Sequence, residues 1–198
     1  MRGPDFIIDI EDSGLASIID IWVCKEVKKD LELWAEKDFY PEISINIFPH
    51  TLEDKNYIND IISILKGYNI CFEIIERRSS LNKNVFENIK LMKQEGFKIS
   101  LDDLGVGFTN FSILYEIPLS SVKIDRKIIE YTKDKKGFIL YKNICELCSD
   151  LNYQIILEGI ETQDEYDKLV NPKINIIQGW YYSKAICFDE VYQYSKSF

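Results

Sequence analysis

Residues 99–126 read ISLDDLGVGFTNFSILYEIPLSSVKIDR, and the segment contains two apolar runs that both end at charged residues. The first run stops at two adjacent aspartates, and the second carries a lysine and an aspartate at its end. Short continuous apolar runs of this kind are typical of strands in a parallel sheet that is covered by helices. The segment therefore predicts strands over 97–103 and 121–125, with charged side chains where each strand ends.

The same alternation of strand and helix patterns extends over the rest of the chain. A doubly wound sheet and a closed barrel both fit an alternation of this kind. No GxGxxG sequence opens the first unit, which disfavours a dinucleotide-binding fold. No repeat or linker interrupts the pattern, so we expect a single domain over 1–198. Further strands are predicted over 42–48, 69–75, 153–159 and 174–179, and helices over 14–37, 51–65, 82–95, 109–116, 136–150, 162–170 and 187–195.

Two of the predicted helices begin with residues that are spaced as a capping box. Thr51 with Asp54, and Thr162 with Glu165, place a hydroxyl three residues before an acidic side chain. In that motif the two side chains bond the free backbone N–H groups of the first helical turn. We therefore expect the helices to start at these threonines.

The composition excludes several classes of function. The chain has 198 residues, of which 46% are apolar and 29% charged, as in an ordinary globular protein. The net charge of −9 and the lack of a basic cluster disfavour binding to DNA or to an anionic membrane. The single histidine excludes a histidine metal site and a Ser-His-Asp triad. Without a signal peptide or a long apolar segment, and with an odd number of cysteines, we expect a cytoplasmic protein.

Polar side chains lie at or just after the ends of all six predicted strands. The C-terminal ends of parallel strands open onto one face of a βα array, so we expect these side chains to gather there. Several carboxylates that are buried together need a compensating cation. Ligand oxygens without soft donors favour Mg²⁺ or Mn²⁺, and two such ions activate water for phosphoester hydrolysis. The residues concerned are Asn46, Glu73 with Glu76, Asp102 and Asp103, Lys123, Glu158 with Glu161, and Gln178.

Six motifs follow one another in an order that is similar to a known family. They are INIFP (45–49), FEIIE (72–76), LDDLGVGFTN (101–110), VKIDR (122–126), LEGIET (157–162) and QGWYYSK (178–184). This set resembles the EAL-domain family of cyclic-di-GMP phosphodiesterases. The resemblance implies a TIM-like (β/α) barrel with one strand reversed. It also implies hydrolysis of cyclic di-GMP to linear pGpG with Mg²⁺ or Mn²⁺ as the cofactor.

The resemblance also implies a role for each of these polar residues. Asn46, Glu73 and Asp102 look like ligands of the first metal, and Asp102 with Asp103 like ligands of the second. Lys123 looks like the residue that holds the catalytic water, and Glu158 like the general base. The loop over 104–110 resembles the lid and homodimer contact of the family. Glu76 resembles the carboxylate that anchors this loop, and Glu161 and Gln178 resemble residues that line the site.

The Glu-Ala-Leu motif that names the family, with its following arginine, does not occur in this sequence. We expect it on a first strand upstream, so that 1–198 is an EAL-type barrel that lacks its first strand. The absent glutamate would be a metal ligand and the absent arginine would hold a phosphate, so we expect this chain alone to hydrolyse little. One alternative is a catalytically inactive EAL-like module that binds cyclic di-GMP or a protein partner. Another is a different metal-dependent barrel hydrolase.

Overall fold

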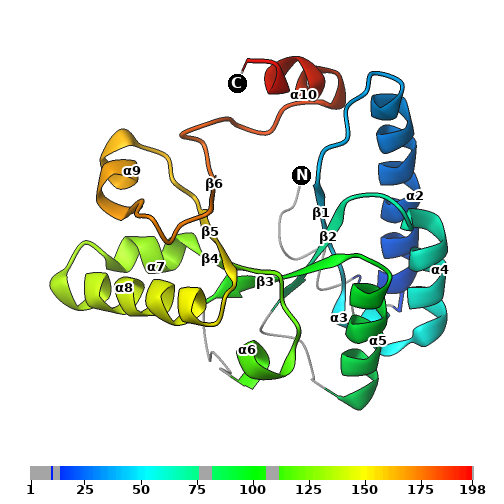
Figure 1. Ribbon diagram of the computed structural model, residues 1–198, viewed down its shortest axis with the longest axis horizontal. Coiled ribbons are helices and arrows are strands. Elements are labelled where there is room, and N and C mark those ends of the chain that lie inside the picture. Colours follow the sequence, from blue (N-terminus) through cyan, green and yellow to red (C-terminus); the bar gives the residue numbers. More distant parts are fainter. Residues whose placement is uncertain (1–9, 11–13, 76–81, 106–111, 198) are drawn as a thin grey trace. The chain divides into compact units, whose positions relative to one another are not determined.

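The computed structural model describes residues 10, 14–75, 82–105 and 112–197. Over these residues the chain forms two compact units. The first unit comprises 1–99 and 113–118, and the second comprises 100–112 and 119–198. Both are built from parallel strands that are followed by helices (Figure 1). Among the described residues, no helix is both long enough and apolar enough to cross a membrane.

The first unit pairs two parallel strands beside a layer of helices. Strand β1 pairs with β2 in a register that sets Asn46 opposite Glu73 at the strand ends. Helix α2 packs on α4, whose buried residues Ile58, Ile61 and Leu65 recur at helical spacing. The elements are α2 (Ala16–Ala35), β1 (Ile43–Asn46), α3 (Pro49–Glu53), α4 (Lys55–Leu65), β2 (Ile70–Ile75) and α5 (Lys83–Gln94), with the start of β3 (Lys98–Leu104) and most of α6 (Ser112–Glu116).

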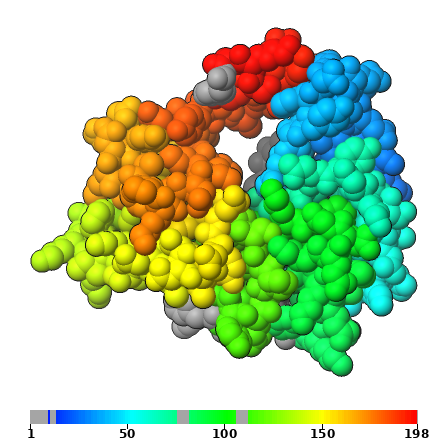
Figure 2. Space-filling model, in the orientation of Figure 1, coloured from blue at the N-terminus to red at the C-terminus, as the bar shows by residue number. Residues whose placement is uncertain are grey.

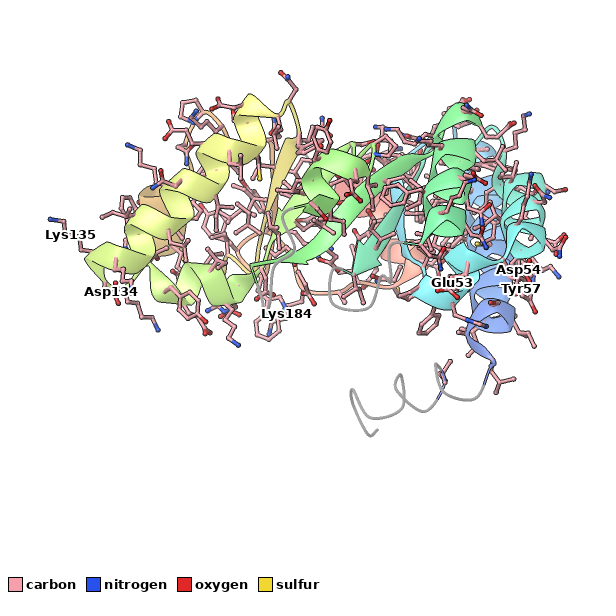
Figure 3. All side chains as sticks on the ribbon, turned by 90° about the horizontal axis from the view of Figure 1, so that it is seen from below. Glu53, Asp54, Tyr57, Asp134, Lys135 and Lys184 are labelled. Carbon is pink, nitrogen blue, oxygen red and sulfur yellow. The ribbon has the colours of Figure 1, made fainter. Side chains whose placement is uncertain are left out.

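The helix that was predicted over 51–65 is two helices, and the predicted capping box at its start is wrong. Helix α3 begins at Pro49, and α4 begins after Asp54, which accepts a hydrogen bond from the backbone N–H of Asn56 at 2.8 Å. Thr51 lies inside α3, where its hydroxyl donates to Asp20 at 2.6 Å. Figure 3 shows Asp54 beside Tyr57 at this junction. The sequence spacing did not reveal that a carboxylate on α2 would engage the threonine.

The second unit continues the alternation with four strands that pair in parallel and in chain order. All four residues of β4 are buried, including the polar Ser121 and Lys123. The pairings run from β3 to β4, from β4 to β5 and from β5 to β6. The elements are the rest of β3, β4 (Ser121–Ile124), α7 (Arg126–Tyr131), α8 (Lys135–Asp150), β5 (Gln154–Glu158), α9 (Gln163–Leu169), β6 (Ile176–Gln178) and α10 (Phe188–Ser195).

In the second unit, the predicted start of α9 is confirmed, whereas α7 is a helix that was not predicted. Thr162 accepts a bond from the backbone N–H of Glu165 at 3.2 Å, so the predicted N-cap of α9 is confirmed. Helix α7 was not predicted, and it starts where Asp125 caps the N–H of Lys127. The Tyr141 hydroxyl on α8 donates to the carbonyl of Leu169 at the end of α9 at 2.5 Å. The atoms of these two segments adjoin in the space-filling view of Figure 2.

A buried carboxylate joins helix α2 to the segment that follows β1. Asp20 is buried, and its Oδ2 accepts bonds from the Phe48 N–H at 3.0 Å and from the Thr51 hydroxyl. Burial raises the pKa of Asp20 to about 6, although the bonds from Thr51 and Phe48 lower it part of the way. Asp20 therefore keeps a proton in the folded state over a pH range in which the unfolded chain has lost it.

We predict that Asp20 makes the stability of the first unit depend on pH. The pKa of Asp20 in the folded state lies above its value of 3.8 in the unfolded chain. The stability that Asp20 contributes is therefore fully present below pH 3.8 and is lost as the pH rises through about 6. Relative to Asp20→Asn, the wild type should lose about 2 kcal/mol of unfolding free energy between pH 4 and pH 7.5. Urea unfolding at both pH values measures this difference. Asp60→Asn, on the exposed side of α4, is the matched control, and an equal difference in both variants would contradict the prediction.

Candidate functional site

An irregularity in β3 brings two consecutive aspartates to the same place. Leu101 pairs with Val122 and Leu104 pairs with Ile124, so β3 has one more residue than β4 between these pairs. The extra residue is a β-bulge, and within it Asp103 has a φ of 59°. The N–H of Asp103 donates to Oδ1 of Asp102 at 2.9 Å. In a regular strand neighbouring side chains point to opposite faces, so the bulge is what allows both carboxylates to approach one site.

Lys123 is the buried cation of this site. Its side chain projects from the middle of the sheet and is only 4% exposed. The Nζ lies 2.8 Å from Oε1 of Glu158 and 3.3 Å from Oδ1 of Asp102. Lys123 pairs in register with Ile156, and Glu158 follows two residues later on the same face of β5. The end of β4 thus places one ammonium between carboxylates from the two neighbouring strands.

The acidic residues of the second unit form a cluster that fits a hard cation. Asp102, Asp103 and Glu158 each offer a carboxylate oxygen, and these three oxygens lie within 4.8 Å of one another. All three side chains are partly exposed, so a cation can reach them. Carboxylate oxygens without sulfur or imidazole ligands are the donors that suit Mg²⁺ or Mn²⁺. The donor set of the second unit therefore agrees with the metal type that the sequence predicts.

A pocket of about 510 Å³ opens beside this cluster within the second unit. Three of the predicted site residues line it, namely Glu158, Glu161 and Gln178. Glu158 and Gln178 are register partners at the ends of β5 and β6, and the N–H of Gly159 donates to the carbonyl of Gln178 at 2.7 Å. The pocket is large enough for part of a nucleotide-sized ligand, and its lining combines acidic side chains with the cationic side chains of Arg126 and Lys184.

The remaining predicted residues lie in the first unit or outside the described residues. Asn46 and Glu73 stand opposite each other at the ends of β1 and β2, where Asn46 is exposed and Glu73 is buried. Glu76 and positions 106–110 of the predicted loop are not among the described residues.

Three residues that also line the pocket were not predicted as site residues. Arg126 follows Asp125 directly in the VKIDR motif, and its guanidinium reaches the segment after β5. Trp180 and Lys184 come from the QGWYYSK motif, and the Nζ of Lys184 lies 5.3 Å from the centroid of the Trp180 ring. Lys184 is labelled in Figure 3. Their position in these two motifs is the feature of the sequence that could have indicated a place in the site.

Parallel strands in chain order, with carboxylates and a buried lysine at their C-terminal ends, define an α/β protein whose candidate site suits a dication. The profile of the EAL domain family matches residues 2–185, so the chain belongs to this family. The strands and helices match solved EAL domains with TM-scores of 0.81 for a protein from Listeria monocytogenes EGD-e and 0.85 for the FimX EAL domain. The predicted fold class, a TIM-like barrel of the EAL type, is thereby confirmed.

Curated relatives are longer than this chain. The oxygen sensor protein DosP of Escherichia coli K12 is 25% identical over 194 residues, which cover 94% of this chain and 24% of DosP. The cyclic di-GMP phosphodiesterase PdeR of the same organism is 28% identical over 199 residues, which cover 96% of this chain and 30% of PdeR. The chain therefore spans about a quarter to a third of the length of these relatives.

Two solved structures show how much of this chain is covered by its structural relatives and at what sequence identity. The Listeria EAL domain protein is 26% identical, and the match covers 98% of this chain and 79% of that one. The PaMucR phosphodiesterase, solved as a c-di-GMP complex, is 24% identical with a TM-score of 0.79, and the match covers 91% of this chain and 76% of that one.

We predict that Lys123→Met lowers the free energy of unfolding by about 3 kcal/mol or more in the presence of EDTA. Removal of the ammonium leaves the carboxylates of Asp102 and Glu158 without the cation that offsets their mutual repulsion in a poorly hydrated site. Urea denaturation measures the change. The control is Lys127→Met on α7, whose lysine is exposed and should cost less than about 0.5 kcal/mol. Equal losses in the two variants would mean that the Lys123 contacts carry no stability.

Proposed function

We propose that the protein is a phosphodiesterase that hydrolyses cyclic di-GMP to linear pGpG with Mg²⁺ or Mn²⁺. The observation that carries the proposal is the contact of Lys123 with Glu158 and Asp102 beside the carboxylate cluster. Family membership supports it, as do relatives named cyclic di-GMP phosphodiesterases and a structural neighbour solved with cyclic di-GMP. An ammonium and several carboxylates at one place are the groups that phosphodiester hydrolysis needs.

We assign the metal ligands as the sequence predicts them. Asp102 would bind both ions, Asp103 would bind the second, and Asn46 with Glu73 would complete the first. When bound, the dications would supply positive charge that lowers the pKa of a nearby water and offsets charge on the phosphate oxygens. The amide and carboxylate oxygens of these four residues are hard donors of the type that both ions prefer.

In this proposal Glu158 acts as the general base, and Lys123 orients both Glu158 and the attacking water. The Glu158 carboxylate accepts the proton of the attacking water, for which it must stay ionised in the resting site. Lys123 keeps it ionised and oriented, because its ammonium donates to Oε1 from 2.8 Å. The same ammonium can direct a lone pair of the water toward phosphorus. Glu161 and Gln178, which line the pocket, would contact the nucleotide, and Glu76 would anchor the loop after Asp103.

The wider setting of this activity is also a proposal. We place the reaction in the bacterial cytoplasm, in a single EAL-type domain, and we expect a homodimer that forms through the 104–110 loop. No DNA or membrane contact is proposed for this chain. Sedimentation of the purified protein at micromolar concentration tests the dimer, and a monomer at that concentration would contradict it.

We predict that Glu158→Gln lowers kcat about 10²- to 10⁴-fold on cyclic di-GMP, since the amide cannot accept the proton of the water. The assay separates linear pGpG from the cyclic substrate in Mg²⁺ or Mn²⁺, and it uses the whole protein as it is expressed. Affinity for cyclic di-GMP in Ca²⁺, measured by titration calorimetry, should change less than about threefold because the pocket remains.

Glu36→Gln on the exposed side of α2 is the matched control for this experiment. It changes the same side chain away from the pocket and should leave kcat within about twofold. Binding of cyclic di-GMP without any pGpG from the wild type would refute the enzyme and favour the inactive binding module. Turnover by Glu158→Gln at the wild-type rate would refute the role of Glu158.

A further inference from the structure

Arg126 makes a set of contacts that the proposed mechanism does not use. It is the first residue of α7 and follows the end of β4, but its guanidinium reaches the segment after β5. Its Nη1 donates to the carbonyl of Gly159. Its Nη2 lies 3.4 Å from Oε2 of Glu161 and 3.4 Å from Oε1 of Glu165, and its Nε lies 4.0 Å from Glu130.

The segment over 159–161 is shaped to receive this side chain. Gly159 has a φ of +72°, a conformation that favours glycine. A Cβ at this position would lie 2.8 Å from Cβ and 2.9 Å from Cδ of Arg126, so the aliphatic part of the arginine packs where a side chain would otherwise be. The guanidinium continues past this contact to the carbonyl of the same glycine. Arg126 and Gly159 thus fit each other through both packing and a hydrogen bond.

Three further bonds hold the backbone of the same segment from its other sides. The N–H of Gly159 donates to the carbonyl of Gln178 at 2.7 Å, and the N–H of Glu161 donates to Oε2 of Glu165 at 2.9 Å. Glu165 is also a partner of Arg126, and although burial on its own would raise the pKa of Glu165, the bond from the Glu161 N–H and the charge of Arg126 lower it. The Ile160 carbonyl also accepts a bond from the Tyr181 N–H at 3.0 Å. The segment is therefore fixed at four backbone atoms, and Arg126 supplies the bond from the β4 side.

We propose that Arg126 is a positioning residue that fixes the 159–161 segment and, through it, the carboxylate of Glu158. The inference rests on the proposed function, because it gives Glu158 the role of general base. Lys123 and Arg126 lie three residues apart at the end of β4, and they contact Glu158 and Gly159, which are consecutive at the end of β5. A shift of the 159–161 segment would move Glu158 from Lys123, and catalysis is sensitive to displacements of about 1 Å.

The fork of the guanidinium is what this role requires. One nitrogen bonds the carbonyl while another faces two carboxylates, which an ammonium on a flexible stem cannot reproduce in the same geometry. The ion pairs alone would matter little, because the Arg126 side chain is 35% exposed and exposed pairs contribute weakly. The outer partner Glu130 is therefore expected to be dispensable.

The test compares Arg126→Lys and Arg126→Gln with Glu130→Gln in the whole protein. We expect both arginine variants to lower kcat on cyclic di-GMP about 10-fold or more. Arg126 also lines the pocket, so affinity in Ca²⁺ is measured beside kcat, and a loss in kcat that exceeds the loss in affinity is the result expected of a positioning residue. Glu130→Gln should keep kcat within about twofold, since it removes only the contact at 4.0 Å.

Hydrogen exchange of a peptide that covers 157–162 provides a readout that does not depend on turnover. The N–H groups of Gly159 and Glu161 donate from this segment to Gln178 and Glu165, so loss of the Arg126 contact should speed their exchange about tenfold. Peptides from α2 should exchange as in the wild type. Arg126→Lys keeps the charge, and faster exchange in this variant shows that the fork and not the charge holds the segment.

The outcomes separate this inference from the proposed function. If the wild type does not hydrolyse cyclic di-GMP, the proposed function fails and the exchange experiment alone decides whether Arg126 holds the segment. If the wild type is active and both arginine variants keep kcat within twofold, the positioning role is overturned whatever the exchange rates are. If Arg126→Gln does not fold, Arg126→Lys provides the same comparison with the charge and most of the packing retained.

Discussion

The contact of the Lys123 ammonium with Glu158 and Asp102 is the interaction on which the second unit depends. Three strands end in acidic or amide side chains, and parallel pairing in chain order forces those ends to lie next to one another. Carboxylates at such distances repel, and each loses hydration as the strands close around it. The buried ammonium of Lys123 on β4, between the carboxylates of β3 and β5, offsets part of both costs. The sheet can therefore keep its acidic strand ends only because β4 carries a lysine where an apolar residue would otherwise stand.

The backbone around this contact departs from regular geometry at the two places where regular strands could not supply the site. In β3 the bulge and the positive φ of Asp103 let consecutive carboxylates approach one point. After β5 the positive φ of Gly159 turns the chain toward Gln178 and makes room for Arg126. Non-glycine residues in the left-handed region are uncommon, and they persist where the surroundings fix them. Both irregular places adjoin the carboxylates that Lys123 holds.

Much of the fold could be predicted from the sequence, because buried parallel strands read as short apolar runs and amphipathic helices repeat at helical spacing. Helix α7 was not predicted because its six residues are too few to show helical periodicity, although Asp125 could have been recognised as its N-cap. The break between α3 and α4 escaped because Thr51 is engaged by a distant carboxylate, Asp20, which local spacing does not reveal. The candidate site residues were predicted from their places at the strand ends. The bulge and the contacts of Arg126 were not, since they arise from pairing between segments that lie apart in the sequence.

Asp20 and the carboxylate cluster of the second unit are accommodated in different ways, and the difference explains why the cluster favours a cation. Asp20 is a single carboxylate that accepts hydrogen bonds from two neutral donors. Burial still raises its pKa to about 6, so protonation can neutralise it. Asp102, Asp103 and Glu158 are three carboxylates within 4.8 Å, where protonation of all of them would remove the base and the ligands that the proposed reaction requires. Neutral donors cannot offset several like charges at that distance, whereas Lys123 offsets one of them. The negative charge that remains is the physical reason to expect dications among these residues, independently of any family resemblance.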